Sequence, residues 1–248
     1  MENKIARTAM RSRFGMPVLP KNARCQRRLK DGSMCNEEMD EWGDHCQACR
    51  CGPVRYKRHE GCCCLWKNFN VKAGCEAQRE VYIPEWKIKL TEKGKERTVR
   101  ARMDVVATPA LGGTDYYYDV TIRHALNPSN LAETEADATW ALTEAEKVKR
   151  KRYKPKDGMS CTPIACLTNG LSSWTTQQSI ARLACAAQEQ RTSQGLARHR
   201  IRAQWRLQLS RHLARWCGLA VSFSQRHTEQ EQEEILLDES RHSHLRVE

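Results

Sequence analysis

Alternating apolar and polar residues mark three β-strands in the middle of the chain. The runs cover residues 80–90, 99–107 and 116–123 and are rich in Val, Ile, Tyr and Trp, which favour strands. The breaks between them, around residues 93–95 and 109–115, are short and contain glycine, as hairpin connections do. The pattern predicts a meander of three strands.

Apolar residues at helical spacing predict helices on either side of this meander. Residues 60–78 predict a helix that leads into the first strand, and residues 131–153 predict a helix after the third. The second helix has acids in its first half and bases in its last half, which suits the helix dipole. A short apolar run at residues 161–167 predicts a fourth strand, so the fold class is α/β (α+β). The apolar stripe of the second helix consists of Ala138, Ala141, Leu142, Ala145 and Val148.

The two ends of the chain have a different character. Residues 1–24 are basic and poor in apolar residues, so we expect a flexible arm. Residues 171–217 predict basic amphipathic helices, which lie on DNA, on a membrane surface, or against the domain with their arginines in water. Residues 218–248 are polar, and we expect a disordered tail there.

Charge and cysteine content narrow the class of partner. The 248 residues carry a net charge of +12, which favours a polyanion, with DNA as the default and an anionic membrane surface as the alternative. No run of about 18 apolar residues exists, so we expect no membrane span. The N-terminus lacks the apolar stretch of a secretory signal. The 13 cysteines should therefore stay reduced, which favours metal binding over disulfides.

A cysteine- and histidine-rich segment at residues 25–59 has too few apolar residues to form a core of its own. Its residues Cys25, Cys35, His45 and Cys49 are separated by nine, nine and three residues. Zinc binds four such ligands in a tetrahedron and can stabilise a segment of this kind. Cys46 or Cys51 remains open as a replacement for one of the four. The alternative is a set of free thiols, and Cys62 to Cys64 receive no role.

Two carboxylates stand inside predicted strands, where Asp is disfavoured. Asp104 and Asp119 lie among Val, Ile and Tyr on neighbouring strands of the meander, and burying them is costly without a partner. Magnesium is held by one or two carboxylates together with water and substrate phosphate. The two aspartates therefore predict a Mg²⁺ site, unless either faces solvent or pairs with an arginine.

These features resemble a known combination of domains. The stretch Trp42–Cys49, soon followed by a basic-His pair, is similar to the junction in non-LTR retrotransposons where a CCHC zinc knuckle runs into a restriction-enzyme-like endonuclease domain. That pattern continues with Pro-Asp or a variant, a second acid, a Glu and a basic-Tyr step. The resemblance covers about residues 20–165. The matching residues here are Arg58-His59, Met103-Asp104, Asp119, Glu144 or Glu146, and Arg152-Tyr153.

The resemblance implies a function and a fold. It implies a PD-(D/E)XK nuclease-like core, αβββαβ, at residues 60–170, with a central mixed sheet flanked by helices. The activity would be Mg²⁺-dependent nicking of one DNA strand for target-primed reverse transcription, beside a structural Zn²⁺ module. The implied partners are target DNA and element RNA, and the implied location is the nucleus. We expect the C-terminal part of a larger element protein, or a domesticated or decaying copy.

The family pattern places a lysine in its third motif, and the candidate catalytic residues include a replacement for this lysine. The third motif, Asp119-Val120-Thr121, lacks its usual lysine. Lys147 or Lys151, four apart on one face of the following helix, is expected to replace it and to stabilise developing charge. The alternative for both lysines is a solvated helix face.

Three further residues are candidates. Glu80 is expected to assist the two aspartates at Mg²⁺. His59 has three open roles: a capping residue, an extra zinc ligand or a site residue. Tyr153 is expected to pack in the core, with a phosphate contact as the alternative.

Other functions remain open at this level. One is an inactive nucleic-acid-binding module of the same fold. The missing third-motif lysine favours it, as does the stretch at residues 165–170, which departs from the family pattern. Another is a different PD-(D/E)XK enzyme of recombination or repair, against which the knuckle spacing argues. A membrane-surface protein is supported only by residues 198–216.

Overall fold

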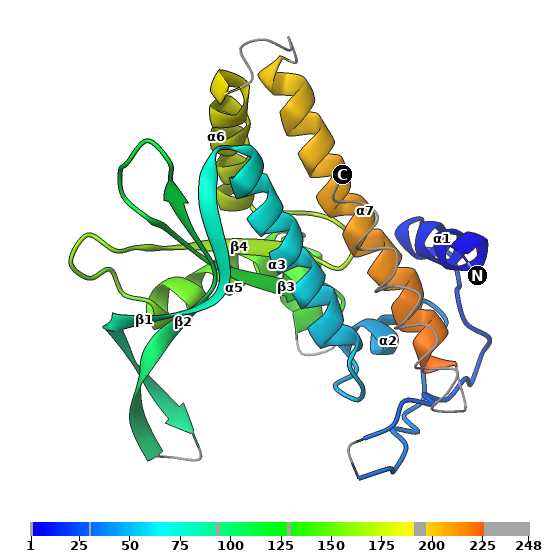
Figure 1. Ribbon diagram of the computed structural model, residues 1–248. Coiled ribbons are helices and arrows are strands. Elements are labelled where there is room, and N and C mark those ends of the chain that lie inside the picture. The colour runs from blue at the N-terminus through cyan, green and yellow to red at the C-terminus, as the bar shows by residue number, and fades with distance from the viewer. Residues whose placement is uncertain (1, 30, 93–94, 128–129, 191–196, 226–248) are drawn as a thin grey trace. The chain divides into compact units, whose positions relative to one another are not determined.

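The chain divides into two compact units, and each is described by itself. In the computed structural model, the first unit comprises the described residues within 1–58, 126–129 and 213–248, and the second comprises those within 59–125 and 130–212 (Figure 1). The structure describes residues 2–29, 31–92, 95–127, 130–190 and 197–225.

A four-stranded mixed sheet forms the second unit. Its strands are β1 (Cys75–Glu92), β2 (Lys95–Pro109), β3 (Tyr116–Arg123) and β4 (Cys161–Leu167), in the order β1-β2-β3-β4. The first three form the predicted antiparallel meander, and β4 lies parallel to β3. The predicted fourth strand is therefore confirmed.

The first two strands extend well beyond the rest of the sheet. β2 pairs with β3 only over Val105–Ala107, whereas it pairs with β1 along nearly its whole length. The outer parts of β1 and β2 thus form a two-stranded ribbon, visible as the long hairpin in Figure 1. Side chains alternate along it, since Ala101 and Met103 are buried while Arg100 and Arg102 are exposed.

Helices flank this sheet. α3 (Val54–Lys72) precedes β1, and α5 (Trp140–Arg152) lies between β3 and β4 in the chain and contacts both. The helix predicted over residues 131–153 is divided into α4 (Leu131–Ala136) and α5. The division lies at Asp137, whose carboxylate accepts the N–H and hydroxyl of Thr139, a local bond that competes with helix continuation. The unit is of the α+β class.

Two further helices follow the sheet. These are α6 (Trp174–Gln190) and α7 (Arg198–Ser224). The apolar face of α7 is buried, and its Trp205 stacks on Phe69 of α3 with ring centroids 4.9 Å apart. This face comprises Ile201, Trp205, Leu209, Leu213 and Trp216. The face therefore packs against protein, with arginines on the remaining surface. Among the described helices, none has the length and apolar character needed to cross a bilayer.

The first unit has a small core made from both ends of the chain. It contains α1 (Glu2–Arg13), α2 (Asp44–Ala48) and the last turns of α7, and Ile5, Leu219 and Phe223 are buried there beside the cysteine-rich segment. The prediction of a flexible arm over residues 1–24 is wrong for α1.

The predicted polar tail is also partly wrong. The tail was placed at residues 218–248, but α7 continues to Ser224 and buries Leu219, Val221 and Phe223. This apolar run continues α7 beyond the predicted end, and it is buried in the same core as Ile5 of α1. Residues 226–248 lie outside the described residues.

Close approach of α1 and α7 depends on Gly218. A Cβ at this position would lie 2.3 Å from the carbonyl oxygen of Ile5. We therefore predict that Gly218→Ala destabilises the protein by about 1–3 kcal/mol, since this overlap with backbone outweighs the gain of about 1 kcal/mol in helix propensity. Urea unfolding measures the change.

Gly61→Ala in α3 is the matched control. Its added Cβ would meet only the imidazole of His212, a side chain that can rotate away, so the helix-propensity gain should be largely kept. Equal effects of the two substitutions would contradict the packing of α1 on Gly218.

Candidate metal and catalytic sites

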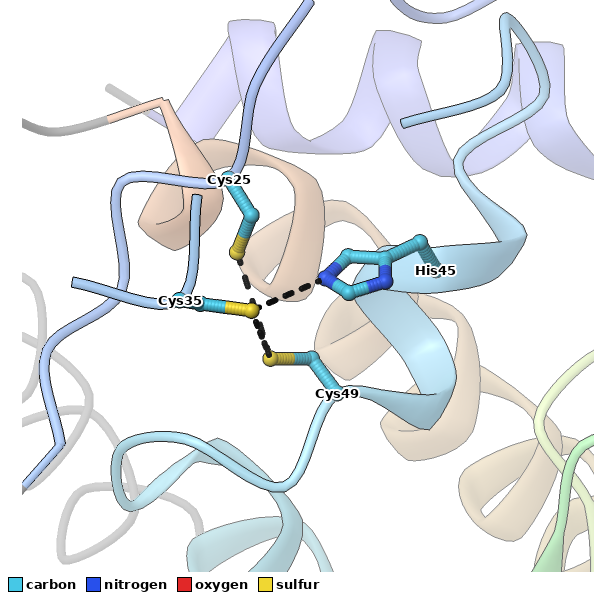
Figure 2. Close-up of side chains that lie close together, drawn as sticks. All are labelled: Cys25, Cys35, His45 and Cys49. Carbon is cyan, nitrogen blue, oxygen red and sulfur yellow. Dashed lines mark hydrogen bonds between the residues drawn. The ribbon is translucent and has the colours of Figure 1, made fainter. Parts of the chain in front are cut away.

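Four predicted ligands converge in the first unit. Cys25 and Cys35 lie on two loop segments held together by the bridges Arg24–Glu38 and Arg28–Met34, while His45 and Cys49 lie one helical turn apart on α2 and its C-cap. All four ligand atoms lie within 4.8 Å of one another. Figure 2 displays the three sulfurs and the imidazole pointing at one place.

The spacing of these atoms matches a tetrahedral zinc site. Ordinary Zn–S and Zn–N bonds place two sulfurs about 3.8 Å apart and a sulfur and a nitrogen about 3.6 Å apart. Cys35 Sγ lies 3.6 Å from His45 Nε2 and 3.8 Å from Cys49 Sγ, and Cys25 Sγ lies 3.9 Å from Cys49 Sγ. The cluster is thus compatible with a structural zinc ion.

The surroundings of the cluster suit three thiolates. The fully buried Arg27 donates to the carbonyl oxygens of Cys46 and Ala220 at 2.8 and 2.7 Å. A zinc ion with three thiolates and one imidazole carries a net charge of about −1, which a buried guanidinium offsets. The carboxylate of Asp40 accepts the N–H groups of Asp44 and His45 and so fixes the turn that carries His45.

The replacement ligands left open by the sequence lie outside the four. Cys46 is buried with its Sγ 3.4 Å from the sulfur of Met39. The thiol of Cys51 lies beside Cys35 and Cys49, and burial, with those sulfurs, raises its pKa to about 12. Neither belongs to the cluster of four ligand atoms.

Asp104 and Asp119 meet in the second unit where two strands separate. The paired stretch of β2 and β3 ends at Val105–Tyr118, and the next step in register brings the two aspartates together. The carboxylate of Asp104 accepts the backbone N–H of Val120 at 2.7 Å. It thereby replaces the ladder hydrogen bond that β2 no longer supplies.

Lys149 is the lysine that reaches this pair. Its Nζ lies 2.6 Å from Asp119 Oδ1, and both side chains are largely buried. The predicted lysines, Lys147 and Lys151, do not lie at the pair: Lys147 is exposed and its Nζ lies 3.6 Å from Glu144, and Lys151 is exposed. The reason is the phase of the helix, which directs Lys149 to Asp119.

Glu80 does not join the aspartates, contrary to the prediction. It interrupts the regular pairing of β1 with a left-handed φ of 59°. Its carboxylate forms an ion pair with Arg102, a half-exposed side chain of β2. That ion pair directs the Glu80 carboxylate to Arg102, and Glu80 belongs to none of the ligand groups among the described residues.

His59 lies beside Asp104 in the second unit. Its Nε2 lies 3.2 Å from Asp104 Oδ2 and 3.0 Å from the carbonyl oxygen of Val120. Both oxygens are acceptors, so Nε2 carries the proton in this arrangement. The neighbouring Arg58 has a different task, since it donates to the side chain and carbonyl of Gln47 in the first unit.

Tyr153 lies beneath the aspartates as a core residue. It is buried beside Trp86 and Tyr117, and its hydroxyl donates to the carbonyl of Arg102 at 3.2 Å. The hydroxyl therefore bonds to backbone and also lies within hydrogen-bond reach of Asp119, which agrees with packing in the core.

The two carboxyl groups differ in their ionisation. Burial raises the pKa of Asp119 despite the Lys149 ammonium beside it. Burial also opposes ionisation of Asp104, but His59 and the Val120 N–H outweigh it and lower the pKa of Asp104. Paired acids whose environments separate their pKa values are typical of catalytic sites.

Comparison of the chain with models of protein families, with curated proteins and with solved structures finds no match.

Removal of one cluster ligand should remove one metal equivalent. We predict that Cys25→Ser and Cys49→Ser each bind one zinc ion fewer per chain than the unsubstituted protein, because a structural site needs all four ligands. Elemental analysis of purified protein measures this. Cys46→Ala is the control and should keep the full metal content. If Cys46→Ala loses one zinc ion per chain while Cys25→Ser keeps its full content, Cys46 and not Cys25 is the ligand.

Loss of Lys149 should destabilise the second unit. We predict that Lys149→Met lowers the free energy of unfolding by about 3 kcal/mol at neutral pH, because it leaves Asp119 buried without its partner. The loss should shrink as pH falls toward the ordinary Asp pKa, since Asp119 is then protonated in the folded and unfolded states alike.

Urea unfolding at several pH values measures this effect. Lys147→Met and Lys151→Met are controls on the same helix and should change stability by less than about 0.5 kcal/mol. A pH-independent loss in Lys149→Met would argue against its pairing with Asp119.

Proposed function

We propose that this chain is a metal-dependent endonuclease that nicks DNA, built on the PD-(D/E)XK plan and joined to a CCHC zinc module. The observation that carries the proposal is the group formed by Asp104, Asp119 and Lys149, in which the Lys149 ammonium lies 2.6 Å from Asp119. The order of elements from α3 to β4 is αβββααβ, which is the expected αβββαβ order with the short helix α4 added before α5, and it supports the same assignment.

The residues present fit a divalent cation. Two carboxylates that influence each other's ionisation approach from adjacent strands, and Mg²⁺ is commonly held by one or two carboxylates, with water and phosphate completing its shell. When bound, such an ion polarises a phosphodiester and activates water.

The protein groups around the aspartates have separate tasks. Lys149 holds a positive charge beside Asp119 and is placed to stabilise the charge that develops on the attacked phosphate. The third motif of β3, Asp119-Val120-Thr121, has no lysine, and the ammonium arrives instead from α5. His59 and the Val120 N–H orient Asp104 and keep it ionised.

A basic surface leads toward these residues along the β1–β2 ribbon. Lys87 faces Arg100 across the ribbon, and both are exposed. Along β2, Arg100 and Arg102 share the side of the strand on which Asp104 lies, because side chains two apart point the same way. Phosphates neutralised by such a row would guide a nucleic-acid strand to the aspartates.

The broader assignment follows from the resemblance to the endonuclease of non-LTR retrotransposons. On this proposal the cut strand is target DNA and the nick primes reverse transcription in the nucleus. The zinc module then contributes to binding of target DNA or element RNA, for which the excess of positive charge on the chain is suited.

One observation favours a second candidate, a binding module of the same fold without activity. Asp104 is satisfied by His59 and Val120, and Asp119 by Lys149, so both carboxylates have partners without any metal. An inactive descendant could keep this arrangement for stability alone.

A plasmid-nicking assay tests the proposal. We predict Mg²⁺-dependent conversion of supercoiled to nicked plasmid, which is abolished by EDTA. Asp104→Asn and Asp119→Asn should lower the rate by a factor of about 100 or more, the scale of losing one electrostatic group at a reacting centre. DNA binding should persist in both variants.

A ribbon variant separates cutting from binding. Lys87→Ala with Arg100→Ala should weaken DNA affinity and reduce the slope of log affinity against log salt by about 2, while saturating DNA restores the nicking rate. Tight, salt-sensitive DNA binding with no nicking under any divalent ion would establish the inactive module instead.

A further inference from the structure

A second cluster of metal-ligating side chains lies at the edge of the carboxylate site. His59 and Cys63 are four residues apart on α3, and Asp104 faces them from β2. One ligand atom from each of the three lies within 4.8 Å of the other two. Positions four apart in a helix share a face, so α3 presents an imidazole and a thiol to one carboxylate.

The separations suit a small tetrahedral ion. His59 Nε2 lies 3.2 Å from Asp104 Oδ2 and 3.8 Å from Cys63 Sγ. Ligands bound to one zinc ion would lie about 3.4 Å apart for nitrogen and oxygen and about 3.6 Å apart for sulfur and nitrogen. Both measured separations lie within a few tenths of an ångström of these values, and Cys63 Sγ lies within 4.8 Å of the Asp104 carboxylate.

Solvent can reach this cluster, and a hydrogen bond from the backbone orients its carboxylate. Cys63 is fully buried, whereas the side chains of His59 and Asp104 are 31% and 16% exposed, so the cluster opens to solvent on one side. The Val120 N–H bond to Asp104 supplies the outer hydrogen bond that orients a ligating carboxylate. The nearby Lys149 charge is offset by Asp119.

We infer that His59, Cys63 and Asp104 form a three-ligand site for a zinc-class transition-metal ion, separate from the zinc module. A thiolate and an imidazole favour zinc, cobalt and similar ions, whereas Mg²⁺ prefers oxygen ligands alone. Binding releases the Cys63 thiol proton to solvent, and His59 binds through Nε2 as a neutral imidazole with its proton on Nδ1.

The site differs from the zinc module in what it leaves open. Four protein ligands close a structural site, but three leave one position for water or a phosphate oxygen, as in catalytic zinc sites. The catalytic consequence of the inference rests on the proposed nuclease function, whereas metal binding itself does not.

Metal stoichiometry of the full chain tests the inference. The metal-free protein is titrated with Co²⁺ alone, and binding is followed by the thiolate-to-cobalt absorption and by elemental analysis after gel filtration. The unsubstituted protein should bind two equivalents. Cys63→Ser should lower the affinity for one equivalent by more than about 100-fold, beyond the usual effect of losing an outer partner, and leave the other unchanged.

Matched variants guard against misfolding. Cys64→Ser, at the next position of α3 and bonded to Arg79, should keep both equivalents. His59→Gln should lose the same equivalent as Cys63→Ser, while Cys25→Ser should lose the other. One equivalent in the unsubstituted protein would overturn the site whether or not the variants fold, as would two retained equivalents in folded Cys63→Ser.

The result is independent of nuclease activity. Two equivalents with no nicking would leave the metal site standing and refute the proposed function. Nicking of Cys63→Ser in Mg²⁺ at the unsubstituted rate, with one equivalent in both proteins, would uphold the nuclease and overturn the inferred site.

Discussion

Burial of two carboxylates inside a small sheet is the constraint on which the second unit depends. Asp104 lies where β2 leaves β3, and it substitutes for the missing ladder bond by accepting the Val120 N–H. Asp119 is more buried, and the Lys149 ammonium from α5 compensates for its charge. The packing of α5 on the sheet thus places Lys149 beside Asp119, and α3 places His59 beside Asp104.

The first unit has few apolar residues from which to form a core. Its core combines Ile5 from α1 with Leu219 and Phe223 from α7, around the four clustered ligands. Arg27 is fully buried among them, and a buried cation is expensive unless nearby negative charge offsets it. A zinc ion bound by three thiolates would supply that negative charge. The buried Arg27 and the four-ligand cluster are therefore consistent with one another.

Patterns local in sequence were predictable, and patterns that depend on distant packing were not. The bounds of β3 and β4 follow from apolar runs, and the four cysteine-module ligands follow from residue type and spacing. Lys149 was missed because Val148 was assigned to the apolar stripe, although Val148 is 45% exposed. The observed stripe runs from Ala145 through Lys149 to Tyr153 in steps of four, which the sequence does contain. Helix α1 has only a short apolar face, with Ile5 and Ala9 four residues apart and both buried, and Ile5 is buried against Gly218 of α7.

Asp104 belongs to two sets of ligands, and its neighbours decide which ion it serves. With Asp119 it forms an oxygen-only pair that suits Mg²⁺, and with His59 and Cys63 it forms a mixed set that suits zinc-class ions. Cys63 is the residue that distinguishes them, because it contributes the only sulfur among these four side chains. In the inferred site, the Cys63 thiol at the face of α3 is therefore the group that would favour a zinc-class ion over Mg²⁺.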